Sequence, residues 1–208
     1  MVNYDLSHLT QDDKQLVSGP IQDDEALFLY SLIRSKRISR ILEVGGLSGY
    51  SAANFLKAIE CMKTGAVYTV EMHQMTCLSD RHKCITKDAR SVMPEDVDGE
   101  PLDLVFFDCH DFIAELHMYF RLKDAGIITD HTVLAMHDTN LHYAQFAAFA
   151  YPVQGGFVHQ PAERKLANIF KDMGYEVFCL HTRACDHGED LPYRHGLTVC
   201  QQFDKLST

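Results

Sequence analysis

The sequence lacks the features that mark several classes of protein. Its longest apolar runs are short, such as 104–107 and 132–136, whereas a membrane-spanning helix needs about 20 apolar residues. The N-terminus has no basic region followed by an apolar stretch, so we see no secretory signal and expect a cytoplasmic protein. The chain also has no tryptophan, no internal repeat and no Pro/Gly-rich linker. We therefore predict a single domain over residues 1–208, with residues 1–22 as an N-terminal extension.

Positive charge is scarce as well. The chain has 19 Lys and Arg residues against 29 Asp and Glu residues, which gives a formal net charge of −10 with histidine neutral. Nucleic-acid binding depends on clustered Lys and Arg that neutralise phosphates, and attachment to a membrane surface depends on polybasic segments. We therefore expect neither nucleic acid nor membrane as a partner.

The seven cysteines are an odd number and are scattered, at positions 61, 77, 84, 109, 179, 185 and 200. This pattern is typical of reduced thiols rather than of a disulfide framework. One segment has metal-ligating residue types, namely Cys179, His181, Cys185 and His187. Its spacing departs from the pairs that usually hold structural zinc, so the alternatives are a zinc site and a buried cysteine followed by a polar loop.

Short β-branched or aromatic runs alternate with helical patterns along the chain. The predicted strands are 40–44, 66–71, 83–86, 102–108, 132–137, 175–181 and 197–203, and the predicted helices follow Asp23-Asp24, cover 50–62 and about 111–123, and extend from Pro161 to Gly174. Such alternation predicts an α/β fold with a parallel sheet and helices on both faces. Only a polar loop, residues 182–195, separates the last two strands, so we expect an antiparallel pair at one edge.

The most informative stretch joins the first strand to the next helix. Residues 41–51 read ILEVGGLSGYS, and a glycine turn in this position lets the backbone approach a ligand and directs amides at it. The spacing is Gly-x-x-x-Gly around Leu47, so the dinucleotide pattern G-x-G-x-x-G is not met. The alternative is a tight turn that serves only the packing of helix on sheet.

Three carboxylates accompany this turn. Glu43, two residues before the first glycine, suits a cationic ligand better than a pyrophosphate, and Glu71 ends the second strand, where a carboxylate can accept both ribose hydroxyls. Asp88-Ala89 follows the third strand and is placed either to recognise the adenine amino group or to cap a surface helix. Together they predict an adenosyl ligand with a positive end and no phosphates, which S-adenosylmethionine fits.

Residues 42–52 resemble motif I of the class I S-adenosylmethionine-dependent methyltransferases. They are most similar to the small catechol-type O-methyltransferases, while 19–26, 103–108 and 135–139 resemble segments of these and of related metal-dependent sugar and antibiotic methyltransferases. The resemblance implies a Rossmann-like, seven-stranded, mostly parallel sheet with an antiparallel C-terminal edge hairpin. The residues it implies for cofactor binding are Glu43, Gly45, Gly46, Ser48, Gly49, Tyr50, Ser51, Glu71, Asp88, Ala89 and Asp108.

A second group of ligand-type residues follows two neighbouring strands. Asp108 ends the fourth strand and His137-Asp138 end the fifth, and the carboxyl ends of parallel strands face one crevice. In catechol-type enzymes the matching positions hold a divalent cation, so the resemblance implies Asp108, His137 and Asp138 as ligands of Mg²⁺, Mn²⁺ or Fe²⁺. The imidazole shifts the preference away from Mg²⁺. Alternatively, His137 points into the sheet and the two aspartates bind metal alone, or the aspartates only cap helices.

The catechol-type enzymes take the acceptor proton with a lysine three residues after the first aspartate, where this chain has Asp111. The segment from Asp108 to Asp111 therefore carries the expected catalytic residues, and we predict His110 as the base because an imidazole titrates near neutrality. The missing lysine weakens the case for a catechol substrate.

Residues 141–160 are rich in aromatic side chains and are predicted to wall a pocket for a planar or apolar acceptor, or else to form a core helix or the contact of a homodimer. The sequence as a whole predicts an S-adenosylmethionine-dependent O-methyltransferase that acts on a hydroxyl of a small molecule. Two alternatives are an NAD-dependent oxidoreductase and a non-catalytic, S-adenosylmethionine-binding regulatory protein of the same fold.

Overall fold

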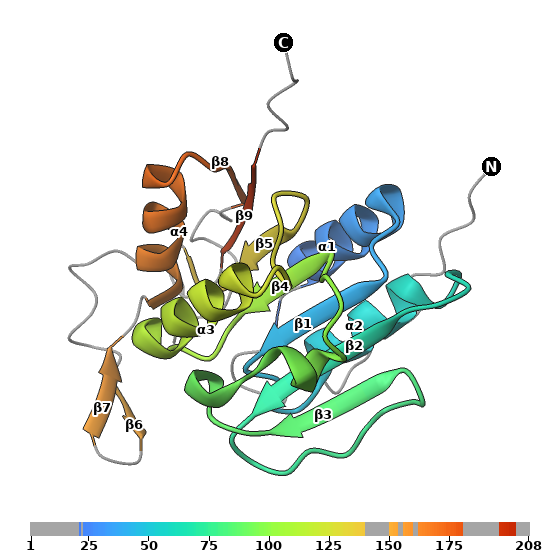
Figure 1. Cartoon of the computed structure of the whole chain (residues 1–208), viewed down its shortest axis with the longest axis horizontal. Coiled ribbons are helices and arrows are strands. Elements are labelled where there is room, and N and C mark those ends of the chain that lie inside the picture. Colours follow the sequence, from blue (N-terminus) through green and yellow to red (C-terminus); the bar gives the residue numbers. More distant parts are fainter. Residues whose placement is uncertain are drawn as a thin grey trace.

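The computed structural model describes residues 21, 23–139, 150–153, 156–159, 162–180 and 196–202. Its main feature is a seven-stranded sheet in the order β3-β2-β1-β4-β5-β9-β8 (Figure 1). The strands are β1 (Arg40–Val44), β2 (Ala66–Glu71), β3 (His82–Thr86), β4 (Leu104–Phe107), β5 (Val133–Met136), β8 (Glu176–Leu180) and β9 (Leu197–Gln201). The first five run parallel, whereas β9 is antiparallel to both β5 and β8. The predicted mostly parallel sheet with an antiparallel edge pair is confirmed.

Helices cover both faces of the sheet (Figure 1). They are α1 (Asp23–Lys36), α2 (Tyr50–Ile59), α3 (Phe112–Asp124) and α4 (Ala162–Asp172). Successive strand residues point to opposite faces, so Ile41 packs with Leu29 and Phe55 from α1 and α2, while Leu42 belongs to the core formed with α3 and α4. The two cores hold the sheet rigid between layers, as the alternating sequence pattern predicts.

Two parts of the fold differ from the sequence-based expectation. Residues 150–153 and 156–159 form a small antiparallel hairpin, β6 (Ala150–Val153) and β7 (Gly156–His159), where one of our alternatives was a core helix. Residues 72–81, all of which the structure describes, connect β2 to β3 as a loop without a helix. The predicted N-terminal extension lies outside the described residues, except for the buried Ile21.

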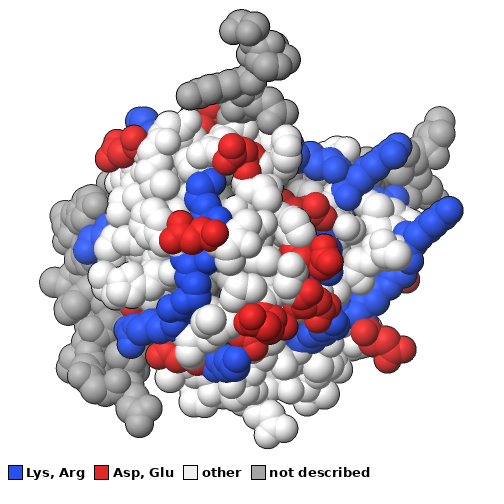
Figure 2. Space-filling model, viewed as in Figure 1, with Lys and Arg blue, Asp and Glu red and all other residues white. Residues whose placement is uncertain are grey.

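Charges of both signs are mixed on the face of the molecule shown in Figure 2, where Lys and Arg side chains are interspersed with Asp and Glu side chains. None of the helices in the described ranges is long and apolar enough to cross a membrane.

We use the word crevice for the carboxyl ends of β1 and β4, because the strand order makes this the expected ligand-binding position of the sheet. The chain leaves β1 toward β2 on one side and reaches β4 on the other, which is the arrangement at which open α/β sheets bind ligands. Gly45 follows β1 with φ of 92°, and a Cβ on this residue would lie 2.4 Å from the carbonyl oxygen of Asp108. Glycine is required here both by the backbone conformation and by the close approach of the two strands.

We expect Gly45→Ala to lower the free energy of unfolding by several kcal/mol, because the added methyl group collides with backbone that cannot move aside. Gly126→Ala is the matched control, since Gly126 has φ of 74° but open space around it, and its cost should be about 1 kcal/mol. Urea denaturation of both variants measures the difference. Equal losses would contradict the close-approach argument.

Candidate functional site

The glycine turn forms one wall of the crevice. The Gly45 amide donates to the carbonyl of Val70 at 2.9 Å, and Gly49, in the left-handed conformation, precedes the first residue of α2. Leu47 and Ser48 are exposed on the turn, whereas Gly46, Gly49 and Ser51 are buried. The turn therefore presents its outer residues at the carboxyl end of β1, where the sequence places cofactor binding.

Glu43 lies buried beneath this turn. Its carboxylate accepts hydrogen bonds from the Ser51 hydroxyl and, at 2.6 Å, from the Thr69 hydroxyl. Burial raises the pKa of Glu43 from 4.5 to about 7, although the two hydroxyl donors act in the opposite direction. A carboxylate that is expensive to ionise when isolated gains most from a cationic ligand placed against it.

Glu71 lies at the end of β2 and faces the turn. Its Oε2 accepts the Leu47 amide at 3.1 Å and its Oε1 accepts the Met72 amide at 2.8 Å. The half-buried carboxylate thus holds the glycine turn and the start of the 72–81 loop together, in the position predicted for a ribose acceptor.

Asp88 and Asp111 both act as helix caps in this structure. Asp88 accepts the Arg90 amide at 2.8 Å at the start of the 3₁₀ helix Ala89–Ser91, whose first residue is buried. Asp111 accepts the Ala114 amide at 3.0 Å at the start of α3 and forms an ion pair with the Arg90 side chain. Asp111 is therefore occupied at the position where the catechol-type enzymes have a lysine.

His137 and the two predicted aspartates converge at the ends of β4 and β5. The Nδ1 atom of His137 lies 3.2 Å from Asp108 and 3.5 Å from Asp138, and the three side chains offer ligand atoms within 4.8 Å of one another. The Nε2 atom lies 3.0 Å from Glu25 of α1. Burial alone would lower the pKa of His137, but the neighbouring carboxylates, Asp108 first, raise it well above its usual value.

His110 approaches the same aspartates from the opposite direction. Its Nδ1 atom lies 2.8 Å from Glu163 of α4, and its Nε2 atom lies 3.8 Å from Asp108 and 3.7 Å from Asp138. Burial opposes protonation, but Glu163 together with Asp108 and Asp138 outweighs it and raises the pKa of His110 to about 10. With no positive charge beside it, His110 therefore keeps its proton at neutral pH, and the predicted role as a base requires that this pKa be lowered.

The imidazoles of His110 and His137 have the same kinds of neighbours. A helix glutamate contacts one ring nitrogen of each, and the other nitrogen faces Asp108 and Asp138, which is how histidine ligands of metals are commonly oriented. Four carboxylates surround the two imidazoles, so acidic groups outnumber the basic groups of this cluster. Glu163 Oε2 is also buried without a hydrogen-bond partner among the described residues. The donor set therefore fits a divalent cation that accepts both nitrogen and oxygen ligands.

Glu25 and Glu163 are candidate site residues that the sequence alone did not indicate. Glu25 lies in the segment that resembles the helix before motif I, and Glu163 is the second residue of α4, but a glutamate in the first turn of a helix is common on stability grounds alone. What distinguishes them is that each is fully buried and contacts a histidine of this cluster. His110 and Asp138 further have φ of 60° and 52°, and such backbone strain in non-glycine residues is concentrated at functional sites.

Two predictions fall largely outside the described residues. Of the 141–160 segment, the structure describes only the backbone of the β6–β7 hairpin, so its role as acceptor wall or dimer contact stays a prediction. His181, Cys185 and His187 are not described either, and the zinc alternative for this segment stays open.

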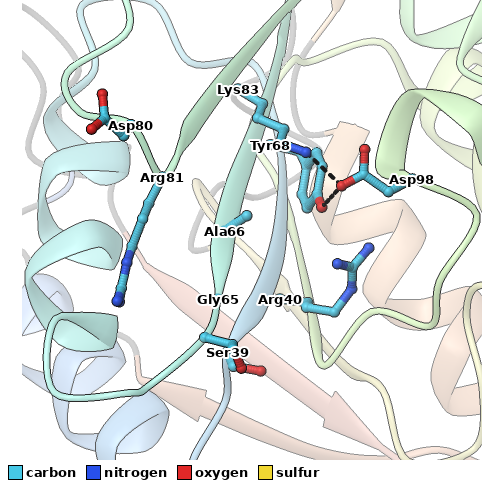
Figure 3. Close-up of a pocket in the computed structure, with 10 residues that line it drawn as sticks. Ser39, Arg40, Gly65, Ala66, Tyr68, Asp80, Arg81, Lys83 and Asp98 are labelled. Carbon is cyan, nitrogen blue, oxygen red and sulfur yellow. Dashed lines mark hydrogen bonds and ion pairs between the residues drawn. The ribbon is translucent and has the colours of Figure 1, made fainter.

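A cavity of about 280 Å³ lies at the amino ends of β1, β2 and β3, away from the crevice. Several of its charged groups are already paired: Figure 3 shows Lys83 and Tyr68 directed at Asp98, and Arg40 donates to the carbonyls of Val97 and Pro101. The cations Arg40 and Lys83 are thus engaged by the protein itself.

Comparison with known proteins agrees with the geometry. Residues 42–139 match the family model of a methyltransferase domain, which confirms the resemblance to class I methyltransferases. No curated protein sequence matches the chain significantly.

Solved methyltransferases share the fold. The O-methyltransferase TomG from Streptomyces achromogenes, involved in tomaymycin synthesis and solved with S-adenosylmethionine, is 17% identical with a TM-score of 0.64 over 95% of this chain and 89% of its own. An O-methyltransferase from Bacillus cereus, bound to S-adenosylhomocysteine, is 16% identical with a TM-score of 0.62 over 95% and 90%. The S-adenosylhomocysteine-bound methyltransferase PaMTH1 from Podospora anserina is 16% identical with a TM-score of 0.58 over 96% and 87%. At these identities the likeness establishes the fold.

The buried carboxyl of Glu43 makes stability depend on pH. Between pH 4.5 and about 7 the folded protein keeps a proton that the unfolded chain releases, so raising the pH through this window destabilises the fold. We expect the free energy of unfolding of the wild type to fall relative to Glu43→Gln by up to about 3 kcal/mol across the window. Urea denaturation at several pH values measures it, with the exposed Glu60→Gln as the control. A difference that does not vary with pH would refute the assignment.

Proposed function

We propose that this chain, whose residues 42–139 match a methyltransferase domain, transfers a methyl group from S-adenosylmethionine to a hydroxyl oxygen of a small molecule with the help of a divalent cation. One observation supports this proposal above the others. The glycine turn with its buried Glu43 directly adjoins Asp108, and Asp108 belongs at the same time to the cluster of histidines and aspartates. A cofactor site and a site for activating an acceptor therefore share one crevice.

The turn and its carboxylates suit the cofactor in charge and shape. Glu43 supplies negative charge for the cationic end of S-adenosylmethionine, and Glu71 supplies acceptors for the ribose hydroxyls once the Leu47 amide gives way. Methyl transfer is an in-line displacement in which the acceptor oxygen bonds to the methyl carbon as the carbon–sulfur bond breaks. The sulfonium leaves as a neutral thioether, and the hydroxyl proton must be removed. Positioning of the two reactants contributes several kcal/mol to such a reaction.

The cluster at β4 and β5 supplies the acceptor side. Asp108, His137 and Asp138 would hold the cation, with Glu25 fixing the ring of His137. A bound divalent cation would lower the pKa of a coordinated substrate hydroxyl and of the nearby His110. His110, held by Glu163 and facing the aspartates, is then the residue placed to take the acceptor proton. The ring nitrogen of His137 among the ligands favours Mn²⁺ or Fe²⁺ over Mg²⁺.

The alternatives make different demands on the same crevice. An oxidoreductase would bind the pyrophosphate of NAD at the turn, where the buried carboxylate of Glu43 is electrostatically unfavourable and the spacing of the glycines differs from the dinucleotide pattern. A non-catalytic protein of this fold would bind S-adenosylmethionine but would have no use for two imidazoles held by buried glutamates.

Calorimetric titration of the metal-stripped protein with S-adenosylmethionine tests the cofactor. We expect binding in the micromolar range, no binding of NAD, and about tenfold weaker binding by Glu71→Gln because hydrogen bonds to a charged acceptor are lost. Glu60→Gln, an exposed glutamate of the α2 end, should bind like the wild type. Binding of NAD in place of S-adenosylmethionine would exclude the proposed function.

Metal binding is tested by titrating the stripped protein with Mn²⁺ and with Mg²⁺ and counting bound metal after dialysis. We expect one tight Mn²⁺ per chain, weaker Mg²⁺ binding, and at least about a tenfold loss in Asp108→Asn and His137→Ala. Asp130→Asn, which changes an exposed carboxylate paired with Lys123, is the control. Circular dichroism verifies that each variant is folded. Unchanged Mn²⁺ binding by both site variants would remove the cation from the proposal.

A further inference from the structure

A row of side chains runs from Glu43, the carboxylate beneath the glycine turn, to a cysteine on the edge strand β3. The strand register pairs Glu43 with Thr69 and Thr69 with Cys84, so these three positions lie side by side on one face of β1, β2 and β3. His82 shares this face; its Nδ1 accepts the Leu78 amide at 3.1 Å, and its Nε2 lies 2.9 Å from the Thr69 hydroxyl. The row ends at a thiol.

The loop 72–81 brings a second thiol to this end of the row. Cys77 is exposed, and its Sγ lies 2.9 Å from the Sγ of the half-buried Cys84. That separation is less than 1 Å beyond the roughly 2.05 Å of a disulfide bond, although both residues are free cysteines here. Neither thiol belongs to the catalytic arrangement described above.

The same loop lies against the glycine turn. A Cβ on Gly46 would meet the Met75 sulfur at 3.0 Å, and one on Gly49 would meet a Leu78 methyl at 3.4 Å. Glu71 is meanwhile occupied by the amides of the turn and of the loop. In this conformation the loop competes with a ribose for Glu71 and covers part of the turn.

We propose that Cys77 and Cys84 form a reversible disulfide that fixes the 72–81 loop over the glycine turn and thereby weakens binding of the adenosyl cofactor. The oxidant is a low-molecular-weight disulfide. The exposed Cys77 thiolate attacks one sulfur of that disulfide and releases one thiol, and Cys84 then attacks the Cys77 sulfur of the mixed disulfide and releases the second. The protein loses two hydrogens and the oxidant is reduced to two thiols.

Cys77 is the attacking residue because of its exposure. Burial and the neighbouring Cys77 thiol raise the pKa of Cys84 to about 12, so Cys84 reacts only when the mixed disulfide is already beside it. The effect on the cofactor rests on the proposed function, whereas formation of the disulfide does not.

The test compares the full chain in its reduced form with the same chain incubated with oxidised glutathione. Peptide mass mapping without reduction should find a Cys77–Cys84 cross-link that is lighter by two hydrogens. Calorimetry with S-adenosylhomocysteine should show about fivefold weaker binding after oxidation, with recovery after treatment with dithiothreitol. Cys77→Ser and Cys84→Ser should bind equally well before and after oxidation. Cys61→Ser, which changes an exposed thiol at the end of α2, should behave as the wild type.

Each outcome decides a separate part. Unlinked Cys77 and Cys84, or cysteines carrying only glutathione, would overturn the pairing. A cross-link without any change in S-adenosylhomocysteine affinity would overturn its coupling to the turn. If the reduced protein binds no S-adenosylhomocysteine, the proposed cofactor is wrong, and the mass map still decides whether the disulfide forms.

Discussion

Mutual neutralisation of buried charges at the carboxyl ends of β4 and β5 is the constraint on which the crevice depends. His110 and His137 are each held between a helix glutamate and the strand-end aspartates, so neither ring can turn without leaving a charge in the interior. Glu25 fixes α1 and Glu163 fixes α4 to this centre. The two layers of helices are therefore bound to the same few polar atoms as well as to their apolar cores.

Much of the sheet follows from local patterns. The runs 40–44 and 66–71 are strands with the predicted bounds, because short buried strands between helices leave a continuous apolar signal. The β6–β7 hairpin could not be predicted from the local sequence, because aromatic residues such as those of this segment occur in strands, in helices and in pocket walls. At the site, the proximity of Asp108, His137 and Asp138 could be predicted, because these residues follow the ends of two neighbouring parallel strands. Glu25 is 112 residues from its histidine, and no local pattern reports a contact over that distance.

The crevice combines two demands that are usually in conflict. A carboxylate such as Glu43 must be buried to be selective for a cation, but burial makes it costly to ionise before the cation arrives. The hydroxyls of Ser51 and Thr69 lessen this cost without supplying a positive charge of their own. Under the proposed function, selectivity for a sulfonium over a pyrophosphate depends on the surroundings of this one side chain as well as on the spacing of the glycines.

The position of β9 in the sheet bears on how the protein folds during synthesis. β9 lies between β5 and β8, yet it is made after every other strand of the sheet. The residue before it, Gly196, donates its amide to Glu25 and accepts the Thr139 amide. Until this segment leaves the ribosome, β5 has an unpaired edge and the polar centre is incomplete. The nascent chain therefore has a period in which the edge of an apolar strand is open to pairing with another chain.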